Sequence, residues 1–458
     1  MGGIEGDYLV VGCGAAGMAF TDALLTQSNA TVTMVDRHDA PGGHWNDAYP
    51  FVRLHQPSAF YGVCSVPFGS DTIDESGTNA GFYDLAGADE IRAYYQRVMH
   101  HHFLPTGRVR YFPSCEWLGD RRFVSRLTGA THEVRARKVV DTTYVKTEVP
   151  AVTPPPFEVA EGVRLVTPSE LTRLERPAER IVIVGGGKTA LDTAVWLLER
   201  GVPPSSIRWL RPREGWWVNR KFQQPHSLLP DFLDGTALQM EAMAHATSVD
   251  DLFARLEASG VFLRLDPSVA PTMLHGAILS ERELLLLRDI EDVVRLGRVR
   301  KIERDAIVLD EGRVPTDERT VHVHCASRGF SRPPCKPIFD GDRITLQPIM
   351  WGFACYQFAM LGVVEATIDG DEKKNALCPS IRYWDRNEDY ALAFLAMMAV
   401  TSAAPAYPAI TTWSKSSRLN PLGGISAHKD NPRVAASRER IKRFGMPAAM
   451  NLRNLTAT

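Results

Sequence analysis

One order of apolar and polar blocks occurs twice along the chain: a short apolar run, a glycine-rich turn and a helical pattern. The first copy consists of the run Asp7–Val11, the turn Gly12–Gly17 and the helical stretch Met18–Leu25. The second consists of Ile181–Val184, a turn over residues 185–190 and the helical stretch Leu191–Arg200. Short apolar runs bounded by turn residues are typical of buried strands. The pattern therefore predicts two strand–turn–helix units.

The glycines of the first turn have the spacing GxGxxG of a phosphate-binding loop. Gly12 permits a tight turn, Gly14 lets the backbone approach a pyrophosphate, and Gly17 lets the helix pack closely on the strand. The helix N-terminus offers free N–H groups and the positive end of its dipole to phosphates. The next run, Ala30–Val35, ends at an acid about 20 residues beyond the turn, where a carboxylate binds ribose hydroxyls. We predict a dinucleotide site formed by Gly12, Gly14, Ala16, Gly17, Asp36 and Arg37; the alternative is a glycine-rich turn without a ligand.

The second turn reads GxGxxA, with Gly185, Gly187, Lys188 and Thr189 as candidate binding residues. The run that follows it, Ile207–Leu210, ends at Arg211, in the place that Asp36 has in the first unit. A carboxylate there would repel a 2′-phosphate, whereas a guanidinium group pairs with it bidentately. Arg211, with Arg213 and Lys188 nearby, therefore predicts NADPH over NADH; the alternative is that Arg211 and Arg213 are solvated loop charges. Two such turns in one chain indicate FAD at the first and NADPH at the second.

After Asp36 the chain reaches Gly42-Gly43-His44-Trp45. Here it resembles the two-dinucleotide-binding-domain flavoproteins, and within them the class B flavoprotein monooxygenases. The resemblance covers roughly residues 5–215 and returns near 321–366. It implies an α/β fold of two Rossmann-like dinucleotide-binding domains, with the FAD domain split in sequence around an inserted NADPH domain. It also makes Gly43, His44 and Trp45 candidate cofactor contacts; for Trp45 the alternative is an ordinary core aromatic.

The sequence departs from related families at two places. The monooxygenase fingerprint FxGxxxHxxx(W/Y) is altered, because Thr167 takes the approximate place of its histidine and its aromatic residues are missing. The disulfide reductases of the same superfamily carry a CxxxxC pair after the Gly-Gly, whereas here the next cysteine is Cys64, alone. A dithiol relay is therefore not predicted, and electrons from NADPH need another acceptor.

In the resembled fold the segment after Gly-Gly-x-Trp passes over the flavin ring. Arg53, His55 and Gln56 are therefore the catalytic candidates, as hydrogen-bond partners of the flavin edge or of a flavin oxygen adduct. The alternative is a proline-punctuated connector whose polar groups cap turns. Gln347, before the apolar helix expected over Phe353–Ala366, is a further candidate flavin contact; the alternative is packing in a domain interface.

The predicted organisation has an FAD-binding part over residues 1–155 and an NADPH-binding domain over 160–325. A helical insertion spans 215–285, the FAD domain returns over 326–375, and a C-terminal extension spans 376–458. The insertion is either a lid or a substrate wall beside the nicotinamide, or a peripheral helical decoration that only stabilises the domain. The extension either completes the substrate pocket or forms an oligomer contact. Arg298–Val314 predicts a β-hairpin around Asp310-Glu311-Gly312.

The composition of the chain bears on which partners, membrane segments and metal sites are expected. Of 458 residues 44% are hydrophobic and 23% charged, and the formal net charge is −2. This balance is ordinary for a soluble protein and does not indicate nucleic-acid or anionic-membrane binding. The longest apolar run, Gly352–Val364, is shorter than the ~20 residues of a membrane span, and no signal peptide is predicted. The seven cysteines have no CxxC spacing and His100-His101-His102 has no chelating spacing. We expect a cytoplasmic protein with reduced thiols and no metal.

The leading prediction is an FAD- and NADPH-dependent monooxygenase that acts on a small organic substrate with molecular oxygen. The resemblance implies hydride transfer to flavin, then a C4a-(hydro)peroxyflavin that oxygenates N, S or a carbonyl. One alternative is a flavin-dependent NAD(P)H reductase or dehydrogenase without oxygen insertion. Another is a non-redox protein in which FAD is a scaffold. The sequence identifies neither the substrate nor the oligomeric state.

Overall fold

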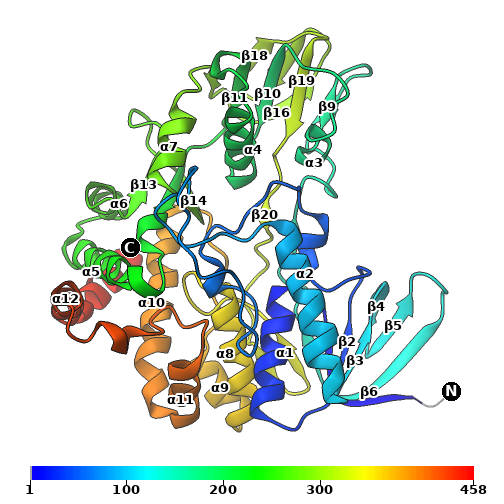
Figure 1. The fold of residues 1–458 in the computed structure, drawn as a ribbon, viewed down its shortest axis with the longest axis vertical. Helices are drawn as coiled ribbons and strands as arrows, with labels where there is room; N and C mark the ends of the chain where they lie inside the picture. Colours follow the sequence, from blue (N-terminus) through cyan, green and yellow to red (C-terminus); the bar gives the residue numbers. More distant parts are fainter. Residues whose placement is uncertain (1–2, 458) are drawn as a thin grey trace.

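The fold is known from a computed structural model, which describes residues 3–457. Two α/β modules lie one above the other, and a layer of helices flanks the junction between them (Figure 1). The lower module contains the N-terminal strand and the upper one contains the second glycine turn. The class predicted from the sequence, α/β with two Rossmann-like units, is confirmed.

The first sheet has the strand order β21-β22-β6-β1-β2-β3, and the pair β4–β5 extends from β6. Its central neighbours β22, β6, β1, β2 and β3 pair in parallel. The strands are β1 Ile4–Val11, β2 Val32–Val35, β3 Val109–Phe112, β4 Cys115–Gly119, β5 Arg122–Ser125, β6 Thr131–Asp141, β21 Phe339–Asp340 and β22 Arg343–Thr345. Strand β22 pairs with β6, so the chain returns to the first sheet after crossing the second module.

Helices α1 (Ala15–Gln27), α2 (Ala88–Val98) and α8 (Ala354–Thr367) cover this sheet. The close packing of α1 on α8 depends on Gly362, because a Cβ there would collide with the Phe20 carbonyl. A short π-helical turn, Met99–Phe103, ends α2 and carries the three consecutive histidines, whose rings are exposed or partly exposed at that helix end.

The second sheet has the order β15-β11-β10-β19-β9 and is parallel throughout. Its strands are β9 Leu165–Val166, β10 Arg180–Val184, β11 Ile207–Leu210, β15 Val293–Val294 and β19 Thr320–His324. Helices α3 (Pro168–Leu171), α4 (Lys188–Glu199) and α7 (Glu281–Arg288) flank it. Parallel sheets are covered on both faces and consist of continuous apolar runs, which explains why β10 and β11 could be predicted to within one residue.

A smaller sheet of order β18-β17-β16-β8 packs on the upper module. Its strands are β8 Glu158–Val159, β16 Val299–Ile302, β17 Ala306–Leu309 and β18 Gly312–Pro315. The hairpin predicted over Arg298–Val314 is therefore incomplete as a description. The turn at Asp310-Glu311-Gly312 joins β17 to β18, and an additional turn before it joins β16 to β17. This turn was not predicted, because its polar residues Glu303–Asp305 are also compatible with an alternating strand pattern.

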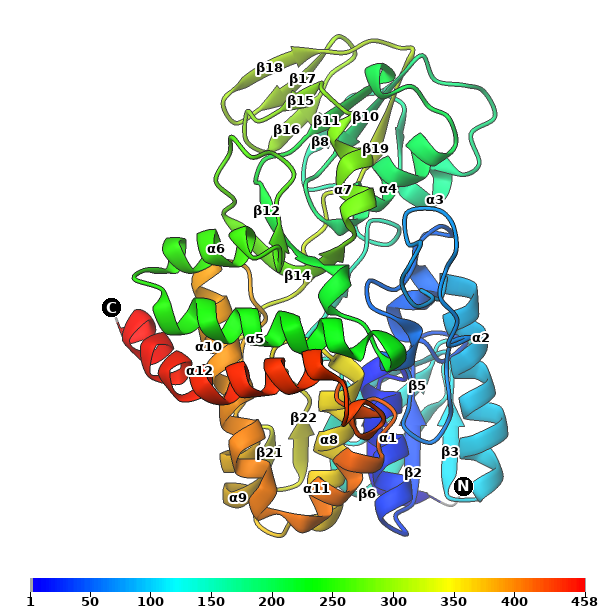
Figure 2. The ribbon, with the colours of Figure 1, turned by 60° about the vertical axis from the view of Figure 1, so that its left-hand side comes forward.

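The segment predicted as a helical insertion also contains strands. Strand β12 (Gly215–Asn219) pairs with β13 (Phe262–Leu263) and, in parallel, with β14 (Met273–Leu279), and helices α5 (Leu229–His245) and α6 (Val249–Ala258) lie between them. The last helix, α12 (Pro432–Ala457), lies along α5, as Figure 2 shows. The remaining elements are β7 Thr147–Glu148, β20 Gly329–Phe330, α9 Asp371–Leu377, α10 Asn387–Ala403 and α11 Pro408–Ser416. The insertion and the C-terminal extension thus form one helical layer.

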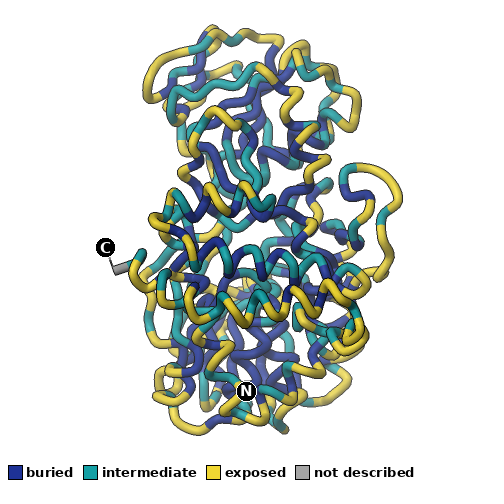
Figure 3. Tube along the Cα trace, turned by 90° about the vertical axis from the view of Figure 1, so that its left-hand side faces the viewer, coloured by how far each residue is buried: buried dark blue, intermediate teal, exposed yellow. Residues whose placement is uncertain are grey.

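Buried residues form continuous cores in both modules and continue through the narrower junction between them (Figure 3). One segment of the helical layer differs from the sequence expectation. Residues Asn387–Ala406 are long and apolar enough to cross a membrane, with mean hydropathy 1.3 over a window that is 28% buried in the fold. The sequence expectation did not pick out this segment, because it considered unbroken apolar runs and polar residues such as Thr401 interrupt this one. In the fold, α10 packs against α6, α12 and β14.

Candidate functional site

The two glycine turns have the same backbone design. Gly12 and Gly185 open them with φ of +97° and +134°, a region that favours glycine. A Cβ on Gly12 would collide with the Thr142 side chain, and one on Gly185 would lie 2.8 Å from the Cys325 carbonyl oxygen. Each turn therefore packs against the end of a neighbouring parallel strand, β6 or β19. Both lie at the carboxyl edge of their sheet, where ligands of such folds bind.

Gly14 and Gly187 are the N-cap residues of helices α1 and α4, and no side chain in the described chain caps either N-terminus. Both helices lie within the described part of the chain, and the first turn of each contains no acidic residue. A Cβ on Gly187 would meet no described atom within 4 Å, and one on Gly14 would make only an ordinary contact, at 3.4 Å from the Gly43 Cα. Uncapped N–H groups at both turns, with open space at Gly187 and no steric conflict at Gly14, fit a bound phosphate at each.

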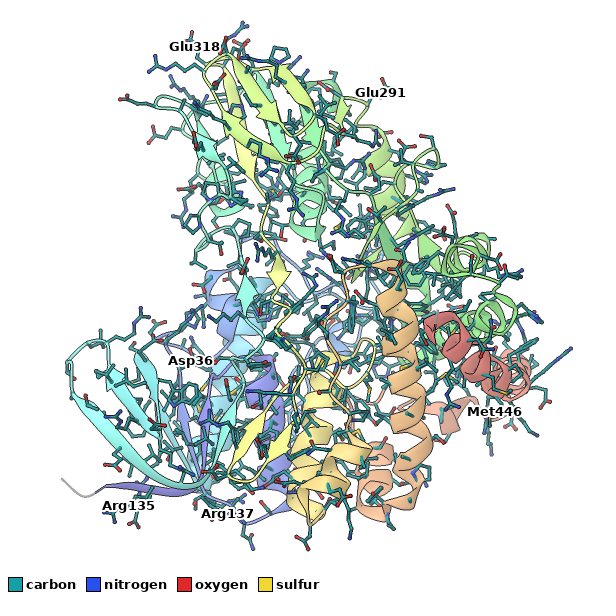
Figure 4. The ribbon with its side chains drawn as sticks, turned by 180° about the vertical axis from the view of Figure 1, so that it is seen from behind. Asp36, Arg135, Arg137, Glu291, Glu318 and Met446 are labelled. Carbon is teal, nitrogen blue, oxygen red and sulfur yellow. The ribbon has the colours of Figure 1, made fainter. Side chains whose placement is uncertain are left out.

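Asp36 lies at the carboxyl end of the first sheet, on the side that faces the second module (Figure 4). Its Oδ2 accepts a hydrogen bond from the Cys13 N–H, and its Oδ1 accepts from the His38 N–H at 2.8 Å. The His38 ring bridges Asp36 Oδ1 (3.0 Å) and Asp47 Oδ2 (2.9 Å). The hydrogen bond to Asp36 raises the pKa of His38, although burial opposes it. A carboxylate has about four lone-pair sites, so Asp36 keeps capacity for a ribose hydroxyl. Arg37 is exposed, 3.9 Å from Asp47.

The Gly42-Gly43 pair lies against the first turn. The Gly42 N–H donates to the Cys13 carbonyl (2.9 Å), and a Cβ on Gly43 would lie 2.8 Å from the Gly14 Cα. His44 and Trp45 follow in a 3₁₀ turn. Burial lowers the pKa of His44 to about 4, so its ring is neutral at physiological pH. Trp45 is buried in the core and donates to the Tyr61 hydroxyl at 2.6 Å.

The catalytic candidates of the connector have different surroundings. Arg53 is exposed and forms a β-bridge to Gly87. Burial lowers the pKa of His55 well below its usual value, and the positive charges of Lys188 and Arg220 lower it further. His55 therefore lies near the second turn, whereas Gln56 donates only a long hydrogen bond, 3.5 Å, to the Phe60 carbonyl.

Gln347 is engaged with the backbone of Lys336 and Thr345; its Nε2 donates to the Thr345 carbonyl at 3.4 Å. Its Oε1 accepts from the Lys336 N–H (3.1 Å) and its Nε2 donates to the Lys336 carbonyl (2.8 Å). The side chain is buried. It fixes the segment that enters β22, and its position beside a cofactor stays a prediction.

The connector also carries a contact that sequence reasoning missed. The Tyr49 hydroxyl donates to Asp192 Oδ2 on α4 at 2.6 Å, and Phe51 stacks on Trp196 of the same helix, with ring centroids 4.8 Å apart. Lys188, in the second turn, forms an ion pair with Asp192 Oδ1. The segment after the first turn is therefore docked on the helix that starts at the second turn.

Glu283 and Arg220 complete this buried polar group. Glu283 Oε2 lies 2.7 Å from the Arg220 guanidinium, and Glu283 Oε1 lies 3.8 Å from Lys188 Nζ. Burial raises the pKa of Asp192. For Glu283 burial also acts to raise the pKa, but the charges of Lys188 and Arg220 outweigh it and the pKa is lowered. Only the i, i+4 spacing of Lys188 and Asp192 was readable in the sequence.

The two arginines after β11 differ in exposure. Arg211 is 5% exposed, lies 3.2 Å from Glu214 and stacks over the Trp209 ring at 4.7 Å. Burial lowers its pKa to about 10. Arg213 is partly exposed and donates to Asp385 Oδ1 at 3.1 Å. Thr189 points its carbonyl at the Thr193 hydroxyl (2.8 Å) within α4. Among residues 3–457 no three His, Cys, Asp or Glu side chains are grouped as metal ligands.

Comparison with known proteins places the chain in a family. Residues 10–66 match the model of an NAD(P)-binding Rossmann-like domain. A cyclohexanone monooxygenase mutant from Rhodococcus sp. Phi1 bound to NADP⁺ is similar in structure, with a TM-score of 0.49, 14% identity, and coverage of 89% of this chain and 99% of that one. A flavin-containing monooxygenase from Stenotrophomonas maltophilia is also similar in structure, with a TM-score of 0.41 and 15% identity. The match covers 82% of this chain and 99% of that one. Uncharacterized proteins of Mycobacterium tuberculosis and Mycobacterium bovis are 44% identical over 443 residues, which is 96% of this chain and 81% of theirs. The chain therefore belongs to the family of these mycobacterial proteins.

Proposed function

We propose that this protein is an FAD- and NADPH-dependent oxidoreductase of the monooxygenase type, acting on a small organic substrate. The observation that carries the proposal is the pair of uncapped glycine turns, each at the carboxyl edge of its own parallel sheet, with the connector of the first docked on the helix of the second. Two dinucleotide sites joined in this way suit hydride transfer between a nicotinamide and a flavin.

The residues present fit both cofactors. FAD would lie along the Gly12–Gly17 turn, with Asp36 at its ribose and Gly43 against the pyrophosphate. NADPH would lie along the turn of residues 185–190, because Gly187 leaves open space there. We assign residues 1–155 and 326–375 to the FAD domain, since β22 pairs with β6, and residues 160–325 to the NADPH domain.

When bound, FAD would supply the redox chemistry, which is acceptance of hydride from NADPH and transfer of electrons to oxygen. The chain's own residues bind, orient and exclude water. Tyr49 and Asp192 hold the connector on α4, and Lys188 is fixed at the turn by its ion pair. We assign to the neutral His55 ring, whose pKa is lowered by burial and by the charge of Lys188, the role of a hydrogen-bond donor to the flavin edge.

A reductase without oxygen insertion is the second candidate. It is favoured by Thr167, which takes the place of the fingerprint histidine and serves as a helix cap here. Its hydroxyl accepts from the Glu170 N–H (3.3 Å), and Glu170 accepts from the Thr167 N–H (2.7 Å). This is a capping box at the start of α3, and it uses the side chain for structure.

Anaerobic mixing with NADPH followed by admission of oxygen tests the proposal. The purified protein should contain FAD, lose its flavin absorbance with NADPH, and pass through a distinct absorbing species before oxidised flavin returns. Immediate return of oxidised flavin with release of peroxide would favour the reductase. No loss of absorbance with NADPH or NADH would contradict both and leave FAD as a scaffold.

A further inference from the structure

A carboxylate from the C-terminal extension lies within a group of basic side chains. Asp385 Oδ1 is 2.9 Å from His275 Nε2, 3.1 Å from an Arg213 guanidinium nitrogen and 3.5 Å from one of Arg332. The four residues come from distant segments: Arg213 follows β11, His275 is on β14, Arg332 follows β20, and Asp385 precedes α10. One carboxylate oxygen thus gathers three donors, as a phosphate oxygen does in arginine-based sites.

This group adjoins the second glycine turn. A Cβ on Gly186 would lie 2.9 Å from the Arg213 carbonyl oxygen and 3.8 Å from the Arg211 Cα, so the segment after β11 lies directly on the turn. Arg211 is buried and already paired with Glu214. Arg213, whose side chain is 29% exposed, is therefore a cation near the turn that an incoming anion can reach; one of its guanidinium nitrogens also donates to the Thr272 and Asp385 carbonyls, at 2.6 and 3.1 Å.

The group keeps a net positive charge. Burial acts to raise the pKa of Asp385, but the His275 hydrogen bond and the charges of Arg213 and Arg332 bring it to about 2, so it is ionised. Burial lowers the pKa of His275, which is therefore neutral at physiological pH. Two guanidinium groups then face one carboxylate. The adjacent Arg382 and Asp389, 4.0 Å apart, balance each other.

We propose that Asp385 competes with the 2′-phosphate of NADPH for the guanidinium groups of Arg213 and Arg332. A phosphate monoester carries a charge of roughly −1.5 to −2 and three acceptor oxygens, so it is a stronger ligand than one carboxylate. The Asp385 N–H is held by Asp389 Oδ2 at 2.7 Å. The Asp385 carbonyl accepts from the Leu274 N–H (2.9 Å) and from Arg213 (3.1 Å). The backbone is thus held at both its N–H and its carbonyl, so the carboxylate can leave the arginines by a change of side-chain rotamer. The inference rests on the proposed function, because it concerns one end of the second cofactor.

The competition makes Asp385 a determinant of cofactor selectivity. NADH carries no 2′-phosphate, so it does not displace Asp385 and does not gain from its removal. Asp385→Asn removes the competing charge and keeps the size of the side chain. It should therefore tighten binding of NADPH and leave binding of NADH unchanged.

The test is calorimetric titration of the full-length protein with adenosine 2′,5′-bisphosphate, and with 5′-AMP as the probe that lacks the 2′-phosphate. Asp385→Asn should lower the Kd for the bisphosphate about tenfold, the gain expected from one additional charged hydrogen-bond partner. The Kd for 5′-AMP should not change. An unchanged bisphosphate Kd, or an equal change for both probes, would overturn the proposal.

Two further variants keep the test decisive. Asp292→Asn is the matched control, because Asp292 also pairs with an arginine, Arg208 at 2.9 Å, but not with the Arg213 group; the bisphosphate Kd should stay the same. Arg332→Gln should weaken binding of the bisphosphate and not of 5′-AMP. No effect of Arg332→Gln would contradict the proposal even if Asp385→Asn failed to fold.

One further measurement distinguishes inorganic phosphate from the cofactor as the ligand of this site. Another distinguishes failure of the proposed competition from failure of the proposed function. Inorganic phosphate should compete with adenosine 2′,5′-bisphosphate only weakly. If inorganic phosphate bound the site as tightly as the bisphosphate does, the assignment of the site to the cofactor would be overturned. If Asp385→Asn tightens bisphosphate binding and NADPH reduces no flavin in either protein, the competition stands and the proposed function fails. If NADPH reduces the flavin and its preference over NADH is unchanged in Asp385→Asn, the proposed function stands and the competition fails.

Discussion

Replacing Tyr49 with phenylalanine removes one hydroxyl from the contact between the two modules. That hydroxyl is the donor to Asp192 Oδ2 at 2.6 Å, whereas Lys188 pairs with the other oxygen, Oδ1. The aromatic ring is retained, so no cavity forms. The Asp192 side chain is only 12% exposed, so water does not readily replace the lost donor. A hydrogen bond to a charged group contributes about 1.5–3 kcal/mol, and we expect Tyr49→Phe to lower the free energy of unfolding by that amount.

Equilibrium unfolding in urea measures this loss. Tyr356→Phe is the matched control, because the Tyr356 hydroxyl is 2.7 Å from the neutral Ser414 hydroxyl within the lower module; its loss should cost about 1 kcal/mol or less. In a double-mutant cycle with Asp192→Ala the effect of Tyr49→Phe should largely disappear. Equal small effects of the two phenylalanine variants, within about 0.5 kcal/mol of wild type, would refute a charged contact between the modules.

Three other predictions concern separate parts of the chain. His38→Gln should cost more stability at pH 6 than at pH 9 in urea unfolding, because a raised folded pKa gives stabilisation that is complete below the ordinary histidine pKa of about 6.5 and is lost as pH rises through the raised value; a pH-independent cost would contradict this. Arg220→Met should destabilise the fold by about 3–5 kcal/mol, since it leaves Glu283 charged and buried without its closest partner; a loss under about 1 kcal/mol would be inconsistent with burial of the pair. Under native conditions a thiol reagent should modify Cys335 first, because it is exposed while Cys64 is half-buried and the other cysteines are buried; rapid modification of several thiols, counted by mass, would argue against these burial assignments.

Local sequence signals were sufficient to predict the two strand–turn–helix units that contain the glycine turns. Glycine spacing and apolar runs located β1, α1, β10, α4 and β11, because each of these strands ends in an apolar run followed directly by a glycine turn or a charged residue. The strands of the 215–285 segment were not anticipated, because β13 has only two residues, His275 and Gly276 interrupt the apolar run of β14, and a bulge interrupts the register of β12 with β14.

The candidate site shows the same limit. The turns and Asp36 were predictable from spacing, whereas the partners of the charged residues were not. Arg211 and Arg213 both looked free in the sequence, yet Glu214 pairs with one and Asp385, from the C-terminal extension, pairs with the other. Tyr49 gave no signal, because a tyrosine in a proline-bounded connector becomes informative only once α4 lies beside it.

Two matched glycine substitutions test most directly whether one chain holds two separate dinucleotide sites. Gly14→Ala and Gly187→Ala each place a methyl group in the space before a turn, where the fold itself accommodates it. Flavin content and anaerobic bleaching by NADPH are measured on both variants and on the wild type. Gly14→Ala should lose flavin, and Gly187→Ala should retain flavin that NADPH reduces slowly or not at all. Wild-type bleaching in Gly187→Ala, or full flavin content in Gly14→Ala, would contradict the assignment of the two sites.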